Sequence, residues 1–381
     1  MLSMRRLACS GAMAMAVATA AWSSVCVAQD ATAPQTLRQA ADDRLLIGAA
    51  VMSNSLDDPK LAQLIADQFN CLTGENEFKV QPTEPEKGQF QFEGADKILA
   101  FAEAHNMKMV GHNLCWHSQI PSWMFSDENG KPLSRDEALA NLKEHIDGVV
   151  GHFKGKIIGW DVVNEAISDS PSQYLRPTPA RRAIGDDYIV QAFRLAHDAD
   201  PDTQLYYNDY NDEQPGKLKN VLRLVKELKA ANVPIYAVGI QGHWILKNAA
   251  STIKQLDEAI DAYNAAGVKV MISELDVEVL PRSTGGANVN ARESGANPYP
   301  NGLPADIAQQ QADFYRQIFE VVNKHAGVVT RVTFWGTHDG TSWLNDWPVR
   351  GRTNHPLLWD RQLQPKPAFY AVLKTLAAGG K

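Results

Sequence analysis

The chain has 381 residues, of which 44% are hydrophobic and 21% are charged. This composition is typical of a globular protein, and it excludes a disordered, collagen-like or coiled-coil chain. Acidic residues outnumber Lys and Arg by 44 to 37, for a net charge of −7. The balance argues against a broad basic surface, so nucleic acid is not expected as a partner.

The chain begins with a pattern typical of a secretory signal peptide. Two arginines precede an apolar run over residues 11–22, and Ala28 follows as a small residue suited to cleavage. The run is shorter than the roughly 20 apolar residues that span a bilayer. We therefore predict a signal peptide over residues 1–28, a folded domain over residues 29–381, and a secreted protein, extracellular or periplasmic, without a membrane anchor.

Eight short apolar runs rich in β-forming residues follow along the rest of the chain. Each run is nearly continuous in apolar character, which is typical of parallel strands that are covered on both faces. The predicted strands are residues 45–51, 68–72, 108–114, 156–163, 204–207, 235–240, 268–273 and 329–334.

Helical patterns lie between these runs. Ser134 is followed three residues later by Glu137, which is the capping-box pattern of a helix start. The predicted helices are residues 96–105, 134–153, 187–199, 217–231, 251–266, 307–324 and 366–376. Strands and helices that alternate in this way predict a single (β/α)8 TIM barrel of the α/β class. A doubly wound open sheet is the alternative, although no glycine-rich phosphate turn follows the first run.

Two cysteines, Cys71 and Cys115, remain after the predicted signal peptide, on runs expected to be adjacent strands. We expect two buried free thiols, with a disulfide bond as the alternative. The longest irregular stretch, residues 281–305, is rich in Gly, Asn and Pro. We expect a surface insertion there, with a lid over the functional face as the alternative.

Polar and aromatic side chains gather where the predicted strands end, which is the functional face of such a barrel. Amides and carboxylates bind sugar hydroxyls, and indole rings pack against sugar CH groups, whereas a phosphate would call for more Arg and Lys. These strand-end residues are Glu75, Asn76, His112, Trp116, Gln119, Asn164, Glu165, Asn208, Tyr210, Gln241, His243, Glu274, Asp276, Trp335 and Trp343. The pattern therefore predicts a site for a neutral carbohydrate.

Glu165 and Glu274 end the fourth and the seventh run, on opposite parts of the predicted ring. Hydrolysis of a glycoside needs two carboxyl groups, one to protonate the leaving oxygen and one to attack the anomeric carbon or activate water. A single Glu is most often a solvated surface charge, but each of these two follows an apolar run. The pair indicates a glycoside hydrolase, and a secreted sugar-binding barrel is the non-enzymatic alternative.

The surrounding motifs resemble those of glycoside hydrolase family 10, the endo-β-1,4-xylanases. Residues 160–166, WDVVNEA, are similar to the acid/base motif of that family, and residues 272–277, ISELDV, are similar to its nucleophile motif. Matching segments run in family order from about residue 45 to residue 375 and include residues 111–119, 207–211, 239–243 and 364–368.

The resemblance implies a (β/α)8 catalytic domain over residues 29–381. Its activity would be that of a secreted retaining endo-β-1,4-xylanase, which hydrolyses internal β-1,4-xylosidic bonds of xylan by double displacement. Xylan and xylooligosaccharides would be the partners of a monomeric enzyme without a cofactor. A hydrolase of β-1,4-glucan, or of short xylooligosaccharides and aryl glycosides, on the same scaffold is the alternative. No metal is expected, because the histidines lack His-x-x-x-His spacing.

The resemblance also implies roles for the site residues. Glu165 would be the general acid/base and Glu274 the nucleophile, and His243 would link Glu274 to Asp276. The other supporting residues are Asn164, expected to bind the sugar 2-hydroxyl, and Gln241, expected to hold a carboxylate. The substrate-binding residues would be Glu75, Asn76, Lys79 and Gln119 on the non-reducing side, His112 and Trp116 near the cleaved bond, Trp335 and Trp343 around the cleft, and Asn208 and Tyr210 on the leaving-group side.

These roles require opposite protonation states of the two glutamates. Glu165 must start protonated, and we expect burial beside Trp116 and the charge of Glu274 to raise its pKa. Glu274 must stay ionised, and we expect hydrogen bonds from Asn164 and His243 to favour its carboxylate form.

Overall fold

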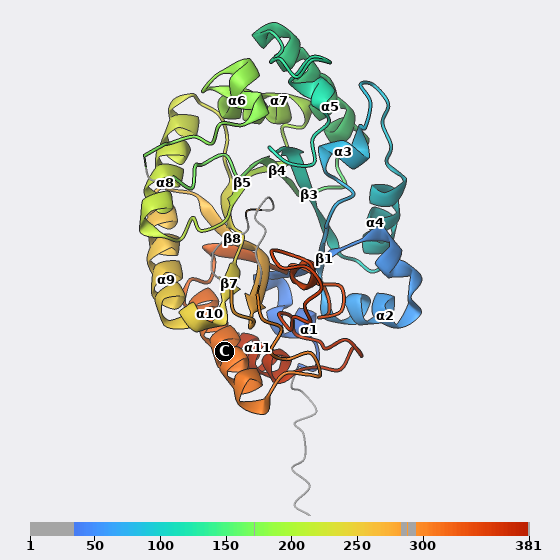
Figure 1. Ribbon diagram of the computed structural model, residues 1–381, viewed down its shortest axis with the longest axis vertical. Helices are drawn as coiled ribbons and strands as arrows, with labels where there is room; N and C mark the ends of the chain where they lie inside the picture. Colours follow the sequence, from blue (N-terminus) through green and yellow to red (C-terminus); the bar gives the residue numbers. More distant parts are fainter. Residues whose placement is uncertain (1–33, 171, 283–287, 289–294, 380–381) are drawn as a thin grey trace, which may run out of the picture. The chain divides into compact units, whose positions relative to one another are not determined.

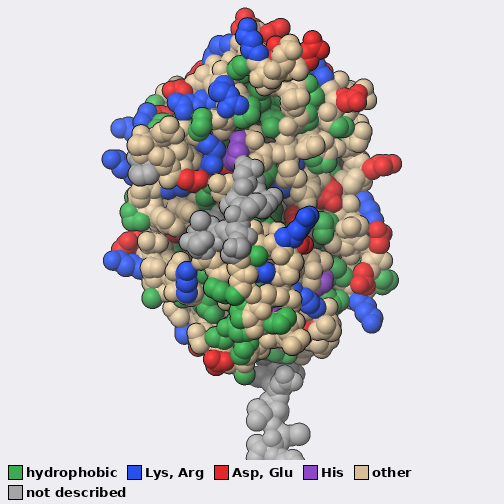
Figure 2. Space-filling view, viewed as in Figure 1, with side chains coloured by type: hydrophobic (Ala, Val, Ile, Leu, Met, Phe, Trp, Pro, Cys, Tyr) green, Lys and Arg blue, Asp and Glu red, His purple; other side chains and the backbone are tan. Residues whose placement is uncertain are grey.

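The computed structural model describes residues 34–170, 172–282, 288 and 295–379. The predicted signal peptide, residues 1–28, lies outside the described residues, as do eleven positions of the irregular stretch, residues 283–287 and 289–294. Within the described ranges, no helix is long and apolar enough to cross a membrane. On the face shown in Figure 2, basic and acidic side chains are interspersed, which is typical of a solvated surface.

Eight parallel strands form a closed barrel at the centre of the described chain (Figure 1). In spatial order they are β1 (Leu46–Val51), β2 (Cys71–Gly74), β3 (Lys108–Cys115), β4 (Gly159–Asn164), β5 (Gln204–Asp209), β6 (Ala237–Ile240), β8 (Lys269–Glu278) and β9 (Val329–Phe334). Strand β9 pairs with β1, with Val332 opposite Ile47, and this pairing closes the ring. The predicted (β/α)8 barrel is confirmed. The open doubly wound sheet is wrong, because such a sheet would leave two unpaired edges.

Helices surround the barrel (Figure 1). The longer ones are α2 (Pro59–Gln68), α4 (Glu93–Ala104), α5 (Arg135–His152), α7 (Tyr188–Ala199), α8 (Pro215–Ala230), α9 (Ala249–Ala265), α10 (Ala305–Lys324) and α11 (Pro367–Ala378). Helix α5 begins with the predicted capping box, in which the Ser134 side chain accepts from the backbone of Glu137.

Some elements are absent from the sequence prediction. They are α1 (Leu37–Ala41), α2, α3 (Val80–Thr83), α6 (Pro179–Ile184) and β7 (His243–Ile245). Helix α2 has a clear start, because the Asp58 side chain accepts from the backbone of Lys60 and Pro59 occupies the first turn. Strand β7 pairs in parallel with the end of β8, with His243 opposite Asp276.

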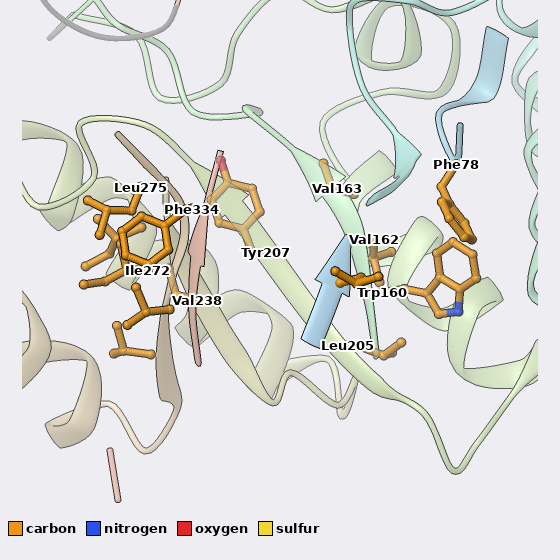
Figure 3. Packing of buried hydrophobic residues seen from close by; sticks show 14 of the residues in the cluster. Phe78, Trp160, Val162, Val163, Leu205, Tyr207, Val238, Ile272, Leu275 and Phe334 are labelled. Carbon is orange, nitrogen blue, oxygen red and sulfur yellow. The ribbon is translucent and has the colours of Figure 1, made fainter. Parts of the chain in front are cut away.

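Apolar side chains fill the space between the barrel and the helices. Phe78, which follows β2, packs against Trp160 of β4 with ring centroids 6.1 Å apart (Figure 3). Gly111 of β3 leaves room for this indole, because a Cβ atom there would lie 2.1 Å from the Trp160 ring. Strands that are covered on both faces in this way explain the nearly continuous apolar runs in the sequence.

The two described cysteines lie on neighbouring strands, Cys71 on β2 and Cys115 at the end of β3. Both are buried free thiols, so the expectation is confirmed. Burial raises the pKa of Cys71 to about 11 and that of Cys115 to about 12. Neither thiol is therefore reactive at neutral pH.

Candidate active site

The carboxyl ends of the strands surround a cavity of about 170 Å³. It is lined by Glu75, Asn76, Lys79, His112, Trp116, Gln119, Asn164, Glu165, Gln241, His243, Glu274, Trp335 and Trp343. Every one of these residues belongs to the set that the sequence singled out. Three members of that set, Asn208, Tyr210 and Asp276, do not line the cavity and lie behind its wall.

Glu165 follows β4 directly and is 3% exposed. Its backbone has φ = +55°, a left-handed conformation that costs an L-residue about 1–2 kcal/mol. Hydrogen bonds hold this conformation, since its N–H donates to the carbonyl of Asn208 at 2.9 Å and its carbonyl accepts from Arg176 Nε at 3.0 Å. The carboxyl group accepts from Trp116 Nε1 at 2.9 Å and from Gln241 Nε2 at 3.1 Å. The main chain and the carboxyl group of Glu165 are thus both held by hydrogen bonds.

The pKa of Glu165 is raised. Burial is the largest cause, and the negative charge of Glu274 adds to it, as expected. The hydrogen bonds from Gln241 and Trp116 act in the opposite direction, because a donor favours the carboxylate form. Burial beside Trp116 therefore raises the pKa of Glu165, while the hydrogen bond from the Trp116 indole N–H lowers it. The net result is a carboxyl group that stays protonated to a higher pH than an exposed Glu.

Glu274 on β8 is also buried, but its pKa is lowered. Burial alone would raise the pKa, but it is outweighed by the hydrogen bond from His243, the positive charges of His112 and His243, and the hydrogen bond from Asn208 acting together. His243 Nε2 lies 3.1 Å from Oε2, and Asn208 Nδ2 donates to Oε1 at 2.6 Å. The expectation that Asn164 donates to Glu274 is wrong, because the Asn164 amide contacts Asn208 at 2.9 Å and Glu165 at 3.4 Å. Asn208 takes that role because it lies between the two carboxylate-bearing strands.

His243 connects Glu274 to a second carboxylate. Its Nδ1 lies 2.9 Å from Asp276 Oδ2, which also accepts from Trp343 Nε1 at 2.8 Å. Burial would lower the pKa of His243, but Asp276 and Glu274 raise it to about 10. The ring is therefore an imidazolium at neutral pH that donates to both carboxylates. Strand β7 produces this geometry, because its pairing with β8 places His243 opposite Asp276.

A second group of polar side chains lies in the same cavity, after β2 and β3. Lys79 Nζ donates to Gln119 Oε1 at 2.8 Å and to Asn76 Oδ1 at 3.1 Å, and it lies 5.1 Å from the ring centroid of Trp116. Burial raises the pKa of Glu75 to about 7, and the charge of Lys79 opposes that rise. These amide, ammonium and carboxyl groups are suited to sugar hydroxyls.

Tryptophans form another part of the cavity wall. Trp343 stacks on Trp347, with ring centroids 4.4 Å apart and an interplanar angle of 18°. Trp335 meets His112 edge to face, with centroids 5.2 Å apart. Indole faces of this kind pack against the CH faces of sugar rings.

Tyr210, predicted on the leaving-group side, is 2% exposed. Its hydroxyl donates to Asp169 Oδ2 at 2.5 Å and accepts from Arg176 Nη2 at 2.8 Å. Asn208 is fully buried and bonds Glu274. The expected contact of these two residues with substrate is therefore not supported by their positions. Sequence reasoning missed Arg176 and Asp169, which lie in an irregular segment without a motif.

Among the described residues, no group of three or more His, Cys, Asp or Glu side chains could hold a metal ion. Two carboxyl groups at one cavity, with pKa values shifted in opposite directions, are suited to cleavage of a glycosidic bond. The fold and the cavity thus define a glycoside hydrolase.

Comparison with known proteins identifies the family. Residues 36–375 match the model of glycosyl hydrolase family 10. The chain is 42% identical over 339 residues to a β-1,4-xylanase of Dictyoglomus thermophilum, covering 89% of this chain and 90% of that protein. It is 42% identical over 346 residues to endo-1,4-β-xylanase A of Xylanibacter ruminicola, covering 89% and 93%. The solved structure of a GH10 endoxylanase from a sugarcane soil metagenome has a TM-score of 0.84 and 39% identity, covering 90% of this chain and 100% of that one. The chain belongs to glycosyl hydrolase family 10.

Proposed function

We propose that the protein is a secreted, retaining endo-β-1,4-xylanase that hydrolyses internal β-1,4-xylosidic bonds of xylan by double displacement. One observation carries the proposal, namely that Glu165 and Glu274 share one cavity with pKa values shifted in opposite directions. The named activity of the relatives from Dictyoglomus thermophilum and Xylanibacter ruminicola supports the substrate class.

In the first step, Glu274 attacks the anomeric carbon while Glu165 donates its proton to the glycosidic oxygen. The bond between the anomeric carbon and that oxygen breaks, and the leaving sugar departs with the proton. His243 and Asn208 hold the attacking carboxylate in its ionised form before the step. The hydrogen bonds from Trp116 and Gln241 stabilise the Glu165 carboxylate that the step produces.

In the second step, Glu165 acts as a base. Once Glu274 carries the sugar as an ester, its negative charge is gone, so the pKa of Glu165 loses one of the causes that raised it. The Glu165 carboxylate takes a proton from water, and the water oxygen attacks the anomeric carbon. Glu274 leaves as a carboxylate, and the configuration of the sugar is retained.

The other cavity residues bind and orient the sugar in this proposal. Asn164 bonds the 2-hydroxyl beside the cleaved bond, and Asp276 supports His243 from behind. The side chains that bind xylose on the non-reducing side are Glu75, Asn76, Lys79 and Gln119, with His112, Trp116, Trp335 and Trp343 around the cleaved bond.

Proton NMR of fresh products from xylooligosaccharides tests the retaining mechanism, and the β-anomer is expected first. An initial α-anomer would mean inversion and would exclude Glu274 as the nucleophile. The rate at which reducing sugar is released from xylan, compared with the rate from cellulose, which is a β-1,4-glucan, tests which polysaccharide is the substrate. Equal or faster release from a glucan would favour the β-glucan hydrolase over the xylanase.

A further inference from the structure

The chain after Glu165 turns back on itself. Ser168 N–H donates to the carbonyl of Tyr174 at 3.0 Å, and Arg176 N–H donates to the carbonyl of Ala166 at 2.8 Å. These two bonds bring Arg176, eleven positions further along the chain, back beside Glu165. The segment therefore places the charged side chain of Arg176 beside Glu165, which is the acid in the proposed reaction.

The guanidinium of Arg176 is held by several acceptors at once. Its Nε donates to the carbonyl of Glu165 at 3.0 Å, and its Nη2 donates to Asp169 Oδ2 at 3.1 Å and to the Tyr210 hydroxyl at 2.8 Å. Asp169 is held in turn by Lys217 Nζ at 3.1 Å. The Arg176 side chain is only 15% exposed. A planar guanidinium fixed at three points has one orientation, and this orientation sets where the Glu165 carbonyl lies.

Glu165 needs such a support because its backbone is left-handed, with φ = +55°. Few non-glycine residues adopt this conformation, and they keep it only where the surroundings enforce it. The direction of the carboxyl group follows from the backbone dihedral angles. A relaxed, extended backbone at this position would turn the carboxyl group away from Trp116 and Gln241.

We propose that Arg176 is a positioning residue for proton transfer: by holding the main-chain carbonyl of Glu165, it keeps the Glu165 carboxyl group aimed at the glycosidic oxygen. Arg176 is not among the residues that line the cavity, so it acts through Glu165. The inference rests on the proposed role of Glu165 as the general acid.

Substrates that differ only in their leaving group test this role. A 2,4-dinitrophenyl β-xylobioside loses its phenolate without protonation, whereas the unsubstituted phenyl β-xylobioside needs the acid. For Arg176→Gln we expect kcat/KM on the phenyl substrate to fall about tenfold or more, because a displacement of the acid by about 1 Å has a large effect on rate. On the dinitrophenyl substrate the loss is expected to stay below about threefold. A merely structural role would lower both values together.

Arg181 provides a matched control in the same segment. It also donates to a carbonyl and to a carboxylate, those of Leu175 (2.8 Å) and Asp186 (2.7 Å), but it does not contact Glu165. Arg181→Gln is expected to leave the ratio of the two kcat/KM values unchanged. A second variant, Asp169→Asn, removes the anion that orients the Arg176 guanidinium and should reproduce the pattern of Arg176→Gln with a smaller loss.

Glu165→Ala, measured in parallel, separates the positioning role of Arg176 from the acid role of Glu165 on which it rests. If this variant loses activity selectively on the phenyl substrate while Arg176→Gln loses it equally on both, or on neither, the positioning role of Arg176 is overturned and the acid role of Glu165 stands. If Glu165→Ala itself shows no selectivity, the acid assignment fails and the inference about Arg176 fails with it. A change in the ratio for Arg181→Gln equal to that for Arg176→Gln would also contradict the inference.

Discussion

His243 lies between two carboxylates, and this position favours the ionised form of Glu274, the proposed nucleophile. With its pKa raised to about 10, the ring is positively charged over the whole neutral range. That charge and its hydrogen bond lower the pKa of Glu274 against the effect of burial. Asp276 never faces the cavity, yet it maintains the imidazolium and thereby the reactive form of Glu274.

Asp276→Asn is predicted to lower the pKa of His243, because the Asp276 carboxylate is the largest of the causes that raise it. The measurement is an NMR titration of the His243 ring, and the pKa is expected to lie at least about one unit below the wild-type value of about 10. Asp257→Asn is a control, because Asp257 pairs with His325 at 2.6 Å on the outer helices. A His243 pKa that stays in place in Asp276→Asn would refute this account of His243.

At the scale of elements, the ring strands and most outer helices could be predicted because each has its own pattern of apolar residues. Strand β7 could not, since it has three residues and owes its existence to pairing with the end of β8. The residues that line the cavity could be found because they follow the strands closely. The support of Glu165 by Arg176, and of Glu274 by Asn208, depends on side-chain directions and on a turn after β4, and no local pattern in the sequence encodes either.

Helix α3 begins directly after Lys79, and a buried hydrogen bond connects the end of this helix to α5. Glu84 Oε2 lies 2.9 Å from His145 Nδ1, and both side chains are fully buried. Removing one partner leaves a buried polar group unsatisfied, at a cost of about 1–3 kcal/mol. Glu84→Ala is therefore predicted to lower Tm by about 3 °C, measured by calorimetry. Lys143→Ala, which removes an exposed ion pair with Asp147 on the same helix, should change Tm little. Similar Tm values for the two variants would contradict the prediction.

At the scale of the whole molecule, the site depends on a closed ring. Its cavity residues extend in sequence from Glu75 after β2 to Trp343 after β9, so the pairing of β9 with β1 is required to bring them together. The described fold carries this site without a disulfide bond, since Cys71 and Cys115 are free. Stability therefore comes from the large apolar core between the barrel and the helices.

Export is predicted to remove the first 28 residues. The intact mass of protein recovered from outside the cytoplasm is expected to correspond to a chain that begins at Gln29. Ala28→Arg, which replaces the small residue at the cleavage point, should leave the longer chain. Exported wild-type protein that retains residues 1–28 would show that the segment is not a signal peptide.

In the proposed mechanism, Glu274 forms a covalent bond with the sugar, while Glu165 donates a proton in the first step and accepts one in the second. A 2-deoxy-2-fluoro-β-xylobioside with a dinitrophenyl leaving group tests it most directly, because the fluorine slows the second step and lets the glycosyl-enzyme accumulate. Mass spectrometry of the intact and digested protein is expected to show one sugar label per chain, on the peptide that carries Glu274. A label on any other residue, or release of dinitrophenol without a label, would contradict the account.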